Sequence, residues 1–436
     1  MSERISTRAG LLALSPILVF LLVYLVGSIV AGNFYKVPIS VAFVATAVYA
    51  VTLLRGMSTH QRVELFSRGA GQPNIMLMLW IFLLAGAFSS SAKAMGAIDA
   101  TVNLSLQLLP DNLLLAGLFI ASCFISMSIG TSVGTVVALS PIAVGIGQTT
   151  HAPVALVLGA VVGGAFFGDN LSFISDTTII ATRTQGCRMS DKFRVNSLIV
   201  VPAALVVMLV YVVLGSKVHA PQVIPSVDVL KVLPYVVVLV TAIAGVDVIV
   251  VLLSGILLSG IIGMCYGSYD LFGWMSAMSD GILGMGELVI VAMLAGGVME
   301  VISHLGGIRW LTQWLTSRIS GRRGAEFSIG TLVALTNVCT ANNTVAILTA
   351  GPIAREIAER FGIDPRKSAS LLDTFSCIAQ AMLPYGAQLL MAAGLAAISP
   401  VEIIPYLYYP FCMAVAVVVA IVAGWPRRFQ SPQIAN

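Results

Sequence analysis

Two aspartates stand seven residues apart in the largely apolar stretch FFGDNLSFISDTT at 166–178. Inside a bilayer a carboxylate is so costly that its presence indicates a function. Surroundings of low dielectric favour its protonated form, and a bound cation favours its ionised form. Asp169 and Asp176 therefore have the chemistry to hold H⁺ and Na⁺ in turn. For Asp176 the alternative is a structural role, as a helix cap or as the ion-pair partner of Arg183.

Three other polar clusters interrupt apolar sequence, at 126–134, 336–344 and 373–386. Backbone that leaves the helix at membrane depth survives only where protein or a water-filled cavity satisfies its N–H and C=O groups, so these breaks predict a binding site. Close helix packing through small residues is the alternative. The candidate ion- or substrate-binding residues are Thr131, Ser132, Asp169, Asn170, Ser172, Ser175, Asp176, Thr177, Asn337, Thr340, Asn342, Asn343, Thr344, Asp373, Ser376 and Gln380.

These side chains offer carboxylate, hydroxyl and amide oxygens, which suit Na⁺ or a proton better than a soft metal. Asp169 and Asp176 are the candidate Na⁺ ligands, whereas Asp373 could instead face the basic residues Arg366 and Lys367. The sequence contains no Walker A, HExxH or GxSxG motif. We therefore expect no enzymatic activity and no cofactor, with Na⁺ and/or H⁺ as coupling ions.

The composition indicates what must surround these residues. The chain has 436 residues, of which 58% are hydrophobic and 10% charged, whereas soluble domains average about 25% charged. Apolar runs long enough to cross a bilayer recur along the chain. We therefore predict an all-α polytopic membrane protein with the lipid bilayer as its main partner. The net charge of +4 is spread over loops, which indicates orientation in the membrane and not nucleic-acid binding.

An internal repeat organises the chain. The segment 83–99 resembles 293–309 at a shift of 210, Pro141 matches Pro352 at 211, and Pro153 matches Pro365 at 212. Two small gaps are thus expected between the copies. Glycines, prolines and polar breaks fall together in the two halves, which predicts a duplicated fold with four breaks converging near the midplane.

The charge of corresponding loops reverses between the halves. The segment 99–111 has no Lys or Arg, whereas 309–323 has four Arg, and 183–194, with Lys192, is basic where 395–402 has only Glu402. By the positive-inside rule the halves have opposite orientation, with both termini cytoplasmic in a bacterial inner membrane. The segment 266–285 has no basic residue and is predicted as an external loop, and Asp247 is a candidate cap for the following helix.

These patterns divide the chain into five parts. N-terminal transmembrane helices occupy 1–73, and a C-terminal helix and tail occupy 397–436. The first repeat spans 74–195, with a hairpin at 112–147 and a broken helix at 153–182. The second repeat spans 286–396, with a hairpin at 324–354 and a broken helix at 367–396. Linking transmembrane helices occupy 196–285.

The stretch at 166–178 resembles the GD-x-x-S-P-x-S-D-T-T signature of the NhaC family of Na⁺/H⁺ antiporters, with Phe173 in place of the proline. The repeat around it is similar to the ion transporter superfamily. The resemblance implies that Asp169, Ser172, Ser175, Asp176 and Thr177 are ion- or substrate-site residues. It also implies a homodimer with a mobile transport domain.

Two functions remain open at this point. The first is Na⁺/H⁺ antiport through intramembrane carboxylates. The second is Na⁺- or H⁺-coupled transport of a small organic solute, such as an amino acid or a carboxylate, because the second-half breaks contain more amides and hydroxyls than a bare ion needs. A channel would be a third class, and steady single-channel conductance would distinguish it.

Overall fold

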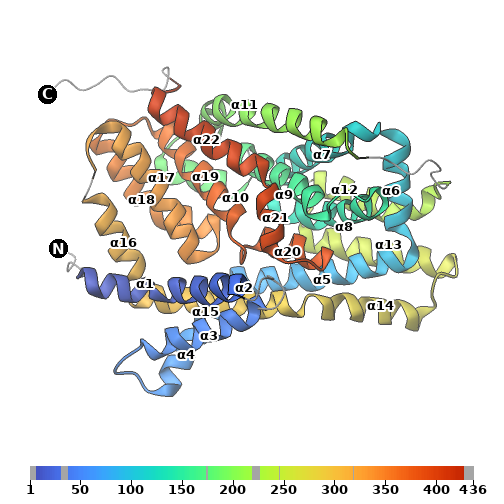
Figure 1. The fold of residues 1–436 in the computed structure, drawn as a ribbon, viewed down its shortest axis with the longest axis horizontal. Coiled ribbons are helices and arrows are strands. Elements are labelled where there is room, and N and C mark those ends of the chain that lie inside the picture. The colour runs from blue at the N-terminus through green and yellow to red at the C-terminus, as the bar shows by residue number, and fades with distance from the viewer. Residues whose placement is uncertain are drawn as a thin grey trace.

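The computed structural model describes residues 6–30, 38–172, 175–218, 226–244, 246–317 and 319–426. Its regular secondary structure is helical, which confirms the all-α prediction. Helices α1, α5, α14 and α15 run along one side of the molecule, and the other helices of both halves stack beside them (Figure 1). Phe173 lies outside the described residues.

The first half of the chain, up to residue 216, contains eleven described α-helices: α1 (Thr7–Leu21), α2 (Gly27–Val30), α3 (Ile39–Thr52), α4 (Thr59–Ala70), α5 (Pro73–Met95), α6 (Ala97–Leu108), α7 (Leu114–Ile129), α8 (Ser132–Thr150), α9 (Val154–Leu171), α10 (Asp176–Gln185) and α11 (Met189–Gly215).

The second half also contains eleven described α-helices: α12 (Val229–Ile243), α13 (Val248–Cys265), α14 (Leu271–Gly284), α15 (Gly286–His304), α16 (Gly307–Thr316), α17 (Gly321–Thr340), α18 (Asn343–Arg360), α19 (Pro365–Met382), α20 (Ala387–Ala396), α21 (Pro400–Ile403) and α22 (Tyr408–Ala423).

The described helices have the length and surface of a membrane protein. Eight helical stretches are long and apolar enough to cross a bilayer, or nine when α21 and α22, bent by 54° at their junction, are joined with the short turn between them. Apolar side chains lie exposed at helical spacing on outer faces, as on α13 at Leu253, Leu257 and Ile261. Lipid is the solvent that such stripes require.

The two halves repeat the same order of helices. Adding 211 to the residue numbers that bound α9 and α10 gives the bounds of α19 and α20, and the same shift carries Ser132, where α8 begins, to Asn343, where α18 begins. Left-handed backbone repeats as well, at Gly130 (φ 74°) and Ala341 (φ 51°). The gap predicted before Pro365 is wrong. The residue before α9 is Pro153 and the residue before α19 is Asp364, and since a helix start accepts proline at either of its first positions, the prolines are offset by one.

Helices of one half pack on helices of the other in reciprocal pairs. Helix α10 packs against α18, and α20 against α8; likewise α5 packs against α14, and α15 against α4. Such reciprocal contacts are those of a two-fold pseudo-symmetry axis between the halves. The opposite orientation of the halves in a membrane stays a prediction from loop charge.

The prediction of a loop at 266–285 is wrong, because α14 occupies 271–284. Asp270 caps this helix by accepting a hydrogen bond from the Gly273 N–H at 2.7 Å. The helix then crosses α5 so closely that a Cβ on Gly281 would lie 2.1 Å from the carbonyl oxygen of Gly86. The predicted cap at Asp247 is confirmed, since its carboxylate accepts from the Ile249 N–H at 2.9 Å.

The α5–α14 crossing gives a test of the fold. We expect Gly281→Leu to destabilise the protein by about 1–3 kcal/mol, because the side chain must displace α5 backbone. Gly284→Leu is the matched control, since a Cβ there meets nothing within 4 Å. Thermal unfolding in detergent measures both variants, and equal losses would contradict the close crossing.

Candidate functional site

Four breaks between consecutive helices meet between the two halves. Helices α7 and α8 are separated at Gly130–Thr131, and α17 and α18 at Ala341–Asn342. Helix α9 ends at Leu171 and α10 begins at Asp176, while α19 ends at Met382 and α20 begins at Ala387. Each of the two predicted hairpin segments is thus a helix pair, and each of the two predicted broken helices is interrupted once.

Asp169 lies in the last turn of α9, and only 4% of its surface is exposed. The Ser132 hydroxyl, at the start of α8, donates to Asp169 Oδ2 at 2.7 Å. The Thr177 hydroxyl, in the first turn of α10, donates a longer hydrogen bond to Asp169 Oδ1 at 3.4 Å. Ser175 donates to the Asp169 carbonyl at 2.8 Å and caps α10. Hydroxyl side chains from α8 and from the start of α10 thus converge on Asp169.

An inner cavity of about 160 Å³ opens beside this carboxylate. Both candidate Na⁺ ligands line it: Asp169 is buried, and Asp176 is exposed within the first turn of α10. Asp176 forms no ion pair with Arg183 in the part of the chain that the structure describes. The other predicted residues along this cavity are Thr131, Ser132, Thr177, Asn342, Asn343, Thr344 and Gln380.

The remaining predicted residues hold the helix ends together or lie along a neighbouring cavity. Ser172 donates to the Met127 carbonyl at 3.0 Å, which joins the ends of α9 and α7. Asn337 donates to the Ser376 carbonyl at 2.8 Å, which joins α17 to α19. Thr340 donates to the Asn342 carbonyl at 3.1 Å across the α17–α18 break. Asn170 and Asp373 face the first turns of α11.

A buried ion pair joins α11 to α19. Lys192 and Asp373 are 1% and 0% exposed, and the Lys192 ammonium also donates to the Asn170 carbonyl and, at 2.7 Å, to the Thr178 hydroxyl. One turn further along α11, Asn196 donates to the carbonyl and the side-chain oxygen of Asn170, both at 3.0 Å. The prediction that Lys192 lies in a basic loop is therefore wrong. Its side chain lies inside the protein, where it pairs with a carboxylate.

The repeat carries the same contacts with different chemistry. The Ser126 hydroxyl donates to the Ala165 carbonyl at 2.6 Å, and at the equivalent place in the second half Asn337 donates to the Ser376 carbonyl. By the same correspondence, the Asp169–Thr177 pair matches Gln380 and Gln388, which are joined at 3.0 Å. The first half thus has a carboxylate where the second has an amide.

The two copies also touch each other at the inner cavity. Gln388 Nε2 donates to the Ser132 hydroxyl at 2.9 Å, and Ser132 in turn donates to Asp169. Gln388 therefore connects the second half to the buried carboxylate through Ser132. Gln388 is not among the predicted residues, because a gap in the repeat separates it from its equivalent; a constant shift of 211 pairs it with Thr177.

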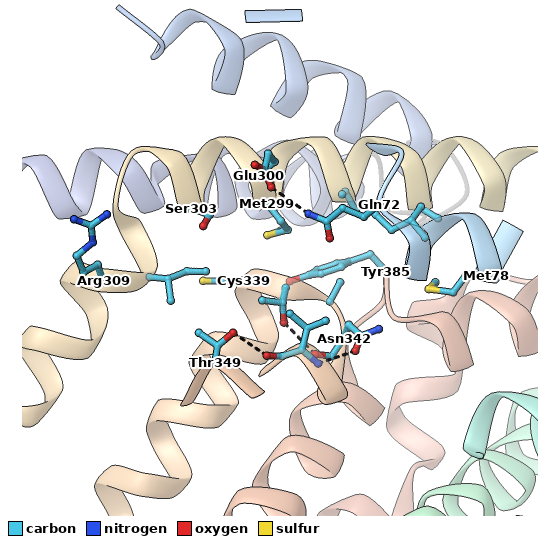
Figure 2. Close-up of a pocket in the computed structure, with 18 of the residues that line it drawn as sticks. Gln72, Met78, Met299, Glu300, Ser303, Arg309, Cys339, Asn342, Thr349 and Tyr385 are labelled. Carbon is cyan, nitrogen blue, oxygen red and sulfur yellow. Dashed lines mark hydrogen bonds between the residues drawn. The ribbon is translucent and has the colours of Figure 1, made fainter. Parts of the chain in front are cut away.

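A larger cavity of about 410 Å³ adjoins the inner one, because Met78, Ala341 and Asn342 line both. Figure 2 shows Glu300 pointing to Gln72, with Arg309 at one end of the cavity and Asn342 on the opposite wall. Gln72 Nε2 donates to Glu300 Oε2 at 3.1 Å. The cavity is thus a vestibule with one acidic and one basic side chain.

The described residues contain no group of three or more His, Cys, Asp and Glu side chains that could hold a metal ion. The inner cavity has instead two carboxylates with hydroxyl and amide oxygens, and none of its described lining residues is Lys, Arg or His. Its chemistry suits a hard monovalent cation or a proton.

Sequence comparisons agree with this chemistry. A model of the Na⁺/H⁺ antiporter family matches the chain twice, over residues 5–216 and 217–425. The chain is 27% identical over 402 residues to the Na⁺/H⁺ antiporter NhaC of Bacillus subtilis, covering 82% of this chain and 84% of that protein. It is 22% identical over 391 residues to the malate-2H⁺/Na⁺-lactate antiporter of the same organism, covering 82% and 83%.

Among solved structures, the YdaH transporter of Alcanivorax borkumensis aligns with a TM-score of 0.45 and 14% identity, covering 90% of this chain and 99% of that one. The family matches meet at residues 216 and 217, where one set of repeated helices ends and the next begins.

The Ser132–Asp169 hydrogen bond gives a test of the site. We expect Ser132→Ala to lower the free energy of unfolding by about 1.5–3 kcal/mol, because a buried carboxylate loses its shorter donor. Ser140→Ala is the matched control on the same helix, since the buried Ser140 hydroxyl has no hydrogen-bond partner among the described residues. Denaturation of the two variants side by side measures the difference, and similar losses would argue against the bond.

Proposed function

Because the chain belongs to the Na⁺/H⁺ antiporter family, and is thus a multi-pass membrane transporter that works by cation-coupled antiport, we propose that Asp169 is the group that binds Na⁺ and H⁺ alternately. The observation that carries the proposal is a buried carboxylate, held by Ser132 and Thr177, at the wall of a cavity without a basic lining residue among those described.

Antiport requires that the transporter does not change conformation with an empty site. An ionised Asp169 without a counter-charge is expensive in the low-dielectric interior, so the transition proceeds when H⁺ or Na⁺ neutralises it. The same carboxylate cannot hold both at once, which makes the two ions compete. Coupling then follows from the cost of one buried charge.

Neighbouring oxygens would complete the Na⁺ site. The amide nitrogen of Gln380 is engaged by the Ala341 carbonyl at 3.3 Å and by Gln388, so its Oε1 is left without a hydrogen bond among the described residues. Asp176 lines the same cavity and adds a second negative charge. We assign Asp176 the role of attracting cations to the cavity, aided by the hydroxyl of Thr131.

The setting in the cell is part of the proposal. The loop charges favour a bacterial cytoplasmic membrane with both termini in the cytoplasm, which would open the vestibule beside Arg309 to the cytoplasm. Assembly as a homodimer rests on the resemblance to the ion transporter superfamily. We expect no cofactor apart from the coupling ions.

The role of Asp169 is tested by ion flux. In liposomes with an imposed pH gradient, we expect added Na⁺ to dissipate the gradient with the unmodified protein and not with Asp169→Asn, because the amide cannot exchange a proton. Asp270→Asn is the control, since it changes an exposed capping aspartate to another good cap. Flux through folded Asp169→Asn would disprove the assignment, and the absence of Na⁺-dependent flux with the unmodified protein would disprove Na⁺/H⁺ exchange.

A second candidate is antiport that carries a small organic solute. The vestibule observation favours it: about 410 Å³ lies within the usual range of ligand pockets, about 300–1,000 Å³, and the wall mixes apolar side chains with Glu300 and Arg309. The malate-2H⁺/Na⁺-lactate antiporter among the relatives has cargo of this class.

A solute screen separates the two candidates. If the cargo is an organic carboxylate or an amino acid, we expect the solute to stabilise the folded protein in the presence of Na⁺, by about 2.7 kcal/mol at 100 times its Kd. The Arg309→Gln variant should lose this stabilisation. Arg323→Gln, an exposed arginine outside the vestibule, is the control. A screen of amino acids and organic acids without any shift would leave bare-ion exchange as the function.

A further inference from the structure

Lys192 occupies a site of the kind that a free cation would take. Its ammonium lies 1% exposed among three oxygens from three different helices: a carbonyl of α9, a hydroxyl of α10 and a carboxylate of α19. Asp169 is likewise a carboxylate with neutral oxygens, the hydroxyls of Ser132 and Thr177, around it. The two carboxylates thus have surroundings of similar chemistry, and at Asp373 the protein itself supplies the cation.

The two sites are directly connected. Asn170, whose carbonyl binds Lys192, follows Asp169, and Thr178, whose hydroxyl binds Lys192, follows Thr177. The Asn170 side chain also donates at 3.5 Å to the hydroxyl of Thr374, which follows Asp373, so the neighbours of the two carboxylates are in contact. A charge placed on either carboxylate is therefore felt by the other at short range.

The internal repeat indicates that the fold does not need this ion pair. The constant shift between the halves relates Lys192 to Ile403 and Asp373 to Val162, and both of these side chains are fully buried. Asn196 corresponds in the same way to Leu407, which is also fully buried. The equivalent junction between the halves is thus apolar and packed. A buried ion pair seldom stabilises more than apolar side chains of similar volume, so the charge itself is the reason to look for a role.

We propose that Lys192 is a tethered counter-cation that permanently neutralises Asp373, so that Asp169 alone of the two carboxylates exchanges its cation. Lys192 acts as a positioning residue, because it does not touch the cargo. With it, the Asp169–Asp373 pair has a net charge of −1 and one incoming cation neutralises it; without it, two would be needed. The proposal rests on the exchange function assigned above to Asp169.

The test transfers the apolar junction of one half into the other. Lys192→Ile and Asp373→Val are made singly and together, and Na⁺-driven proton flux and thermal unfolding are measured in the full-length protein. We expect each single variant to lose about tenfold or more of its exchange, because one buried charge is left unpaired. The double variant should regain both folding and exchange. A double variant that folds as well as the unmodified protein and is as inactive as Asp169→Asn would overturn the proposal, because Asp373 would then be needed for the cargo.

A second measurement separates this role from a merely structural one. In Lys192→Ile the vacated site keeps its carboxylate, so Na⁺ should raise the unfolding temperature more than in the unmodified protein, and this extra rise should disappear in the double variant. An equal Na⁺ effect in all three proteins would overturn the proposal. If the unmodified protein shows no exchange, the proposed function fails, and the Na⁺ effect on unfolding still decides whether Lys192 fills a cation site.

Lys367→Ile is the matched control. Lys367 is also 1% exposed and lies 2.7 Å from the buried Glu326, and it lines neither of the two cavities. We expect this variant to lose stability with an unchanged Na⁺ effect on unfolding. The same extra Na⁺ stabilisation in Lys367→Ile as in Lys192→Ile would contradict a specific site at Lys192.

Discussion

The cost of an uncompensated charge in a medium of low dielectric governs this protein. Asp169 and Asp373 are both buried between the halves, and each is stable there only with a positive partner. Asp373 has Lys192 as a covalently attached partner. Asp169 has two hydroxyl donors and lines a cavity, and on the proposed function its positive partner comes from outside. On the proposed function, one lysine thus distinguishes the carboxylate that stays paired from the one that exchanges its cation.

Duplication supplies the framework in which this difference arises. Equivalent helices around the breaks have matching bounds at one constant shift, and equivalent side chains make equivalent contacts. At the centre the chemistry diverges: Asp169 corresponds to Gln380, and the Lys192–Asp373 pair to Ile403 and Val162. The pseudo-symmetric scaffold therefore places one charged and one neutral half-site against each other, with Gln388 joining them.

Much of this arrangement could be predicted from the sequence, because burial of carboxylates and interruption of apolar runs leave local signals. Asp169, its hydroxyl neighbours and the four breaks are of this kind. Lys192 could not be recognised, since a lysine just before an apolar run looks like any loop cation, and its partner is 181 residues away. The available signal for a buried Lys192 was the polar pair that it forms with Asn196, one helical turn further along the chain. Helix α14 was missed because a segment without basic residues is typical of an external loop, whereas its close approach to α5 depends on Gly86 and Gly281.

The packing of helices from one half on helices of the other has a consequence for biosynthesis. Helix α10 packs on α18, which is made only after most of the second half has been synthesised, and α8 waits in the same way for α20. The first half must therefore enter the membrane with these two surfaces exposed, and the buried carboxylate gains its Gln388–Ser132 connection only when the last helices arrive. A nascent chain thus cannot complete the hydrogen-bond network around Asp169 until nearly all of it has been translated.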